Sequence, residues 1–93
     1  MKTNVHDLKC WPEFFVATLD GRKTFEFRRD DRGFLLGDIL WLREYRVDNE
    51  EYTGRSCRVL VTFVQREPDI AIPAGYIIMG IRLIDVVTAS PDL

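Results

Sequence analysis

The sequence predicts a mainly β fold of the α+β class, a small barrel made from one strongly curved sheet with a single helix near the N-terminus. Apolar and polar residues alternate with period two in several segments, which is typical of strands, while one short segment has helical spacing. A chain of 93 residues also holds too few apolar side chains to fill the core between two separate sheets. An open α+β roll is the alternative architecture.

The composition predicts a globular protein, and the length predicts that residues 1–93 fold as one domain. Hydrophobic residues make up 46 % of the chain and charged residues 30 %, which is too apolar for a disordered chain. Residues 89–93 follow the last predicted strand, and we expect them to be a frayed tail.

The first predicted elements are a short strand and the helix. Val5–Cys10 alternates weakly, which favours a strand. The helix is expected over residues 12–20, because Pro12 suits a first helical turn and Glu13 favours the positive end of the helix dipole. Gly21 then supplies the left-handed residue that commonly ends a helix.

The clearest predicted strand covers residues 23–29. Phe25 and Phe27 lie on one face, whereas Glu26 and Arg28 lie on the other. The usual burial preferences predict that the two phenyl rings are in the core and that Glu26 and Arg28 lie on the more polar side.

Three further strands are expected at Ile39–Arg46, residues 55–67 and Tyr76–Val87. The polar segment 48–54 predicts a hairpin tip between the first two. Residues 67–75 form a loop in which Ile70 and Ile72 look exposed. Gly80 interrupts the last strand and marks a bulge or a barrel corner.

The strand over residues 55–67 is expected to bend or carry a bulge, because both of its faces are apolar near its centre. One face holds every second residue, in the order Cys57, Val59, Val61, Phe63 and Gln65.

The chain has no apolar run long enough to cross a membrane and no apolar core of a secretory signal near Met1, so we expect a cytoplasmic protein with no membrane partner. Cys10 and Cys57 would then be free thiols. The single His and the two Cys lack the close spacing of a zinc half-site, so neither a metal nor a cofactor is expected.

The net charge of −2 argues against a protein that coats nucleic acid through bulk electrostatics. A local basic patch is nevertheless present at residues 22–32, where five Lys or Arg residues and three Asp or Glu residues leave a charge of +2. A nucleic-acid partner would have to bind such a patch.

Several residues of the N-terminal half could form a ligand site. Glu26 and Arg28 are two residues apart on one strand face, so a carboxylate acceptor and a forked donor could receive one ligand, although a surface ion pair would give the same pattern. Lys23 begins the same strand. The further candidates are Thr24 beside it, His6 and Lys9 before the helix, and Trp11 and Tyr45 as rings on which a base could stack.

The segments 6–9, 11–15, 21–28 and 75–81 resemble a bacterial and phage domain family of unknown function in the ASCH superfamily, which is related to PUA domains. The core pattern Gly-x-Lys-x-x-Glu-x-Arg of that superfamily is matched by Gly21, Lys23, Glu26 and Arg28. The resemblance implies a PUA-like barrel that binds RNA or a modified nucleotide between the helix and the barrel.

A related branch hydrolyses an acylated cytidine with a Lys, a Thr three residues later and a distant Glu. Here the position three after Lys23 is Glu26, and Thr24 is only one residue away, so that pattern is not reproduced. The leading expectation is therefore a binding module without turnover, as a monomer or weak dimer. The alternatives are a nucleoside-directed amidohydrolase that uses Lys23 and Glu26, and a protein-interaction domain without a small ligand.

Overall fold

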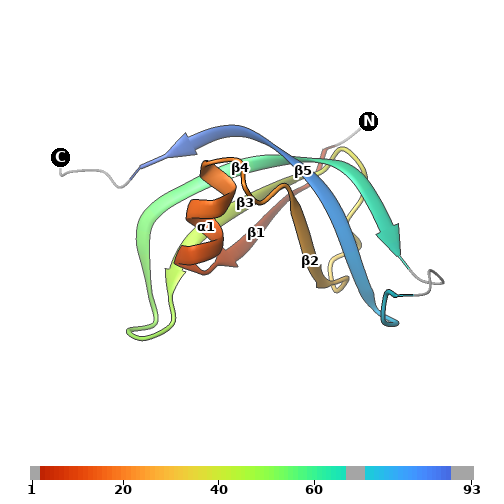
Figure 1. Ribbon diagram of the computed structural model, residues 1–93, viewed down its shortest axis with the longest axis horizontal. Helices are drawn as coiled ribbons and strands as arrows, with labels where there is room; N and C mark the ends of the chain where they lie inside the picture. Colours follow the sequence, from red (N-terminus) through yellow and green to blue (C-terminus); the bar gives the residue numbers. More distant parts are fainter. Residues whose placement is uncertain (1–2, 67–70, 89–93) are drawn as a thin grey trace.

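The computed structural model describes residues 3–66 and 71–88 and contains one curled sheet and one helix (Figure 1). The strands are β1 (Val5–Cys10), β2 (Phe25–Arg29), β3 (Ile39–Arg46), β4 (Glu51–Arg66) and β5 (Tyr76–Val87), and the helix is α1 (Pro12–Leu19). The strand order is β1-β3-β4-β5-β2, with β1 parallel to β3 and the other neighbours antiparallel. Figure 1 shows β4 and β5 as a long arch with α1, β1 and β2 beneath it, so the sheet forms a half-barrel.

The predicted mainly β class, the helix and the positions of the strands along the chain are confirmed. Strand β4 is longer than predicted, because it begins at Glu51 and not at residue 55. Tyr45 and Tyr52 are directly paired across β3 and β4, with ring centroids 5.1 Å apart. A cross-strand aromatic pair stabilises a sheet, so it extends the ladder into the segment that was predicted to be the hairpin tip.

The predicted bulge in β4 is confirmed, since the pairing with β5 shifts register between Val61 and Phe63. The bulge turns Phe63 to the outside, where 58 % of it is exposed, so its predicted place on the face of Val61 is wrong. Gly80 on β5 pairs with Phe63, and a Cβ atom added there would lie 3.1 Å from Thr62 Oγ1. The glycine thus permits a close approach of the two strands at the bulge.

The core lies on the concave side of the sheet and beneath α1. Its largest fully buried side chains are Phe15, Phe34, Leu40, Leu42, Val59, Val61, Ile77 and Met79. Ile72 is also buried, with 7 % exposed, although its position in a loop made it look exposed. The short turn before β5 carries it back onto the protein. Ile70 and the predicted tail at residues 89–93 lie outside the described residues.

The two edge strands, β1 and β2, are bridged by arginine side chains. Arg28 Nη2 donates to the carbonyl of Lys9 at 2.8 Å, and Arg32 Nη1 donates to the carbonyl of Asp7 at 2.8 Å. These bonds satisfy carbonyl groups on a sheet edge that has no neighbouring strand there. We call the gap between β1 and β2 the seam. Arginine side chains bridge it at two points.

Glu44 on β3 is buried and accepts hydrogen bonds from β4. Arg55 donates through Nε at 2.7 Å and through Nη2 at 2.8 Å, and the Thr53 hydroxyl donates at 2.7 Å. The hydrogen bonds from Arg55 are the main reason that the pKa of Glu44 is lower than its ordinary value of 4.5. The bidentate pair thus anchors the start of β4 on β3.

This pair predicts a pH-dependent contribution to stability. Because the pKa of Glu44 is lower in the folded protein than in the unfolded chain, its contribution is complete above about pH 4.5 and is lost as the pH falls through the folded-state value. In urea unfolding between pH 7 and pH 3, the difference between wild type and Glu44→Gln should shrink below that pH. Glu13→Gln, which removes an exposed carboxylate, serves as the control. A Glu44→Gln difference that does not change with pH would contradict this expectation.

Candidate functional site

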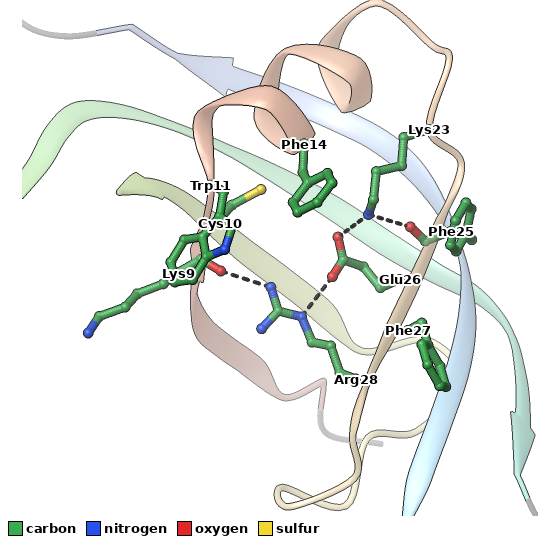
Figure 2. A pocket seen from close by; sticks show the side chains of 9 residues that line it. All are labelled: Lys9, Cys10, Trp11, Phe14, Lys23, Phe25, Glu26, Phe27 and Arg28. Atoms are coloured by element: carbon green, nitrogen blue, oxygen red, sulfur yellow. Dashed lines mark hydrogen bonds and ion pairs between the residues drawn. The ribbon is translucent and has the colours of Figure 1, made fainter. Parts of the chain in front are cut away.

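A cavity of about 420 Å³ opens at the seam between β1, α1 and β2 (Figure 2). Its size is within the range of small-molecule sites. It is lined by Lys9, Cys10, Trp11, Phe14, Lys23, Phe25, Glu26, Phe27 and Arg28. The cavity thus lies between the end of β1, the start of α1 and residues 25–28 of β2.

The floor of the cavity is the carboxylate of Glu26, a residue that is only 4 % exposed. One carboxylate oxygen, Oε2, accepts from Lys23 Nζ at 2.7 Å, and the other, Oε1, accepts from Arg28 Nε at 2.7 Å (Figure 2). One negative charge therefore holds two positive charges in place. The cluster carries a net positive charge, which favours an anionic or electron-rich ligand group.

Lys23 and Arg28 are both oriented by a second contact. Lys23 Nζ also donates to the carbonyl of Phe25 at 2.7 Å, and Arg28 Nη2 donates to the carbonyl of Lys9. The Nε and Nη2 contacts use two of the five N–H groups of a guanidinium. Both side chains stay partly exposed, so the two cations are fixed in direction yet accessible from the cavity.

Aromatic residues border the cavity: the Trp11 and Phe14 rings lie on the same side of β2 as Glu26, whereas those of Phe25 and Phe27 lie on its other face (Figure 2). Trp11, Phe14, Phe25 and Phe27 are each 40 to 49 % exposed, which is high for large apolar side chains. The Lys23 ammonium lies 5.1 Å from the centre of the Phe25 ring and 5.9 Å from that of Phe14. Half-exposed rings around a cationic floor can stack on the face of a planar ligand.

The prediction that Phe25 and Phe27 are buried and that Glu26 lies on the open side is wrong, although the strand and its alternation are confirmed. Strand β2 is the edge of the sheet, and its inner face covers the seam and not the main core. Lys23 and Arg28 neutralise Glu26 there, which removes the usual penalty for a buried carboxylate. Phe27 instead packs on the outside against Tyr76, with ring centroids 5.4 Å apart.

Cys10 lines the cavity but is not suited to act as a nucleophile. It is buried, and burial together with the charge of Glu26 raises the pKa of its thiol to about 11. Burial likewise raises the pKa of Cys57 to about 12, and both cysteines are free. At neutral pH both groups are therefore thiols, whereas the reactive form of cysteine is the thiolate.

The side chains of four residues predicted from sequence line the cavity: Trp11, Lys23, Glu26 and Arg28. Lys9 contributes its carbonyl, while its side chain points away from the cavity (Figure 2) and its ammonium lies 4.4 Å above the Tyr45 ring. Tyr45 is outside the cavity wall, with its ring 6.0 Å from that of Trp11.

Two predicted residues lie elsewhere. Thr24 lines a separate hollow beside the end of α1 and β5. His6 Nε2 lies 2.8 Å from the buried Asp38, whose carboxylate also accepts from the backbone N–H of Leu35, and the His6 ring packs edge-on against Phe34. His6 therefore anchors the loop before β3.

Sequence reasoning missed Cys10, Phe14, Phe25 and Phe27 as cavity residues. Apolar residues at strand and helix spacing predict a core, and their pattern does not reveal that an edge strand faces a gap.

The described residues contain no group of three or more His, Cys, Asp or Glu side chains that could hold a metal ion. Residues 3–66 and 71–88 also include no helix with the length and hydrophobicity needed to cross a membrane.

Comparison with known proteins gives a family without an assigned activity. A protein of Escherichia phage P2, described as an uncharacterized 12.9 kDa protein in the GpA 3′ region, is 34 % identical over 64 residues, which is 69 % of this chain. The matched part spans 57 % of the length of that relative. Residues 5–81 match the model of a domain of unknown function, DUF3850. The chain therefore belongs to the DUF3850 family.

Proposed function

We propose that the cavity binds one nucleotide, free or as part of RNA, and releases it without chemical change. The observation that carries this proposal is the combination of a net positive floor and a rim of half-exposed rings around one cavity. A nucleotide has both matching features, since its phosphate is anionic and its base has two apolar faces. The resemblance of residues 21–28 to the ASCH core motif supports the same ligand class.

The expected contacts follow from the positions of these groups. Lys23 and Arg28 would donate to phosphate or base carbonyl oxygens, and the fork of N–H groups on Arg28 suits either acceptor. The base would stack on a rim ring such as Phe14, which points toward Glu26 and Lys23 (Figure 2), a contact worth about 1 to 3 kcal/mol. Glu26 would act as a positioning residue, because both of its oxygens already hold the two cations.

Hydrolysis of an amide group on a nucleoside is the second candidate, and the contact of 2.7 Å between Lys23 and Glu26 favours it. One observation argues for binding instead. The Lys23 ammonium already donates to two acceptors, the carbonyl of Phe25 and the carboxylate of Glu26, and is thus held as a hydrogen-bond donor. The protein-interaction alternative loses one of its supports, because Ile72 is buried.

A melting-shift titration with the four ribonucleoside monophosphates tests the proposal. At a ligand concentration 100 times its dissociation constant, binding should stabilise the protein by about 2.7 kcal/mol. Phe14→Ala should weaken binding at least about fivefold, whereas Phe63→Ala, which removes an exposed ring on β4 outside the cavity, should leave it unchanged.

Two outcomes would contradict the proposal. The first is the absence of a shift with all four nucleotides, and the second is an equal effect of the two Phe variants. Turnover of an acylated nucleoside that Lys23→Met abolishes would favour the hydrolase instead.

A further inference from the structure

The outer face of β1, β3 and the start of β4 carries a row of rings and cations next to the cavity. We call it the aromatic strip, and its members are Lys9, Trp11, Trp41, Arg43, Tyr45 and Tyr52. Leu40, Leu42 and Glu44 of β3 are buried. Successive residues of a strand point to opposite faces, so Trp41, Arg43 and Tyr45 are on the outside.

The members of the strip contact one another in sequence. The Arg43 guanidinium lies 4.6 Å from the centre of the Trp41 ring and 4.0 Å from that of Tyr52. The Tyr52 ring is 5.1 Å from Tyr45, and Lys9 Nζ is 4.4 Å from Tyr45. The two cations therefore lie among the four rings of this face.

Trp11 joins the strip to the cavity. It is part of the cavity wall, and its ring is 6.0 Å from the ring of Tyr45. Lys9 also belongs to both, since its carbonyl receives Arg28 in the cavity while its ammonium lies on the strip. A ligand that leaves the cavity past Trp11 would thus meet further rings and positive charges.

We infer that the nucleotide in the cavity is one unit of a single-stranded nucleic acid, whose neighbouring units lie along the aromatic strip. The inference rests on the proposed function of the cavity. Rings that stack on bases, with cations beside them for the phosphates, are typical of sites for single strands. Lys9 and Arg43 carry two positive charges, against the single negative charge of Asp7, which lies 3.0 Å from Arg43 Nη1.

The test compares uridine monophosphate with a hexanucleotide of uridine, by calorimetry and by fluorescence anisotropy of a labelled hexamer. The hexamer should bind at least about tenfold more tightly, because each further stacked base adds about that factor. Tyr52→Ala and Arg43→Gln should each remove most of this gain and leave the affinity for the monophosphate unchanged. Unchanged binding of the monophosphate also verifies that both variants are folded.

Phe63→Ala and Arg82→Gln are the matched controls, because they remove an exposed ring and an exposed Arg side chain outside the strip. Neither should change hexamer binding. A hexamer of deoxyuridine, which differs from the uridine hexamer only in lacking the 2′-hydroxyl groups, identifies the sugar preference. Tight binding of either hexamer supports the inference.

The inference is overturned if the hexamer binds no better than the monophosphate, in which case the proposed function of the cavity still stands. It is also overturned if an acidic hexapeptide of glutamate binds as tightly and with the same dependence on Tyr52, which would indicate a protein partner. A hexamer that depends on the strip but not on Phe14, together with no binding of the monophosphate, would contradict the proposed function and leave the strip as the binding site.

Discussion

Replacing Glu26 with glutamine should lower the free energy of unfolding by about 2 to 4 kcal/mol, a large loss for a small domain. Glu26 is buried and holds both Lys23 and Arg28 at 2.7 Å. Without the negative charge of Glu26, the cations of Lys23 and Arg28 lose their common partner in a site that is partly removed from water. Removal of one partner from a buried pair costs far more than the intact pair contributes, because the remaining charge is uncompensated.

Urea unfolding measures this effect, and two variants serve to interpret it. The double variant Glu26→Gln with Lys23→Met should be more stable than Glu26→Gln alone, because it removes one of the two unpaired cations. Asp20→Asn is the control, since it breaks an exposed ion pair with Arg22 and should cause no measurable change. A Glu26→Gln protein as stable as wild type would show that the cluster does not depend on the carboxylate.

The Phe15→Ala substitution should cost about 3 to 5 kcal/mol, whereas Phe27→Ala should cost about 1 kcal/mol or less. Phe15 is fully buried on the inner face of α1, and Phe27 is 49 % exposed with its ring against Tyr76. The two substitutions delete the same atoms, so the difference reflects mainly burial. Alanine favours a helix over a strand, which narrows the difference. Equal losses of unfolding free energy would contradict the placement of β2.

Strand β2 also illustrates how far the sequence predicts this fold. Alternation in residues 25–29 identifies a strand with two unlike faces, and both are present. Alternation does not indicate which face is inside. That depends on the place of the strand in the sheet order β1-β3-β4-β5-β2, which is set by contacts distant in sequence.

The candidate site, too, is only partly predictable from the sequence. The spacing of Lys23, Glu26 and Arg28 places three charges close together on one short segment, and these side chains are in contact in the structure. The rest of the cavity comes from β1 and α1, which meet β2 only because the sheet curls. His6 shows the opposite case, since its partner Asp38 is 32 positions away and draws it to another part of the protein.

The central claim is that the seam between β1, α1 and β2 is a nucleotide site, and NMR titration of the ¹⁵N-labelled protein with the four ribonucleoside monophosphates tests it most directly. The predicted result is saturable shifts of the backbone amide signals of residues 9–14 and 23–28 with at least one nucleotide. Amides of residues 82–87, at the far end of β5, should not move. Shifts centred on another part of the chain, or no saturable shift with any of the four nucleotides, would contradict the claim.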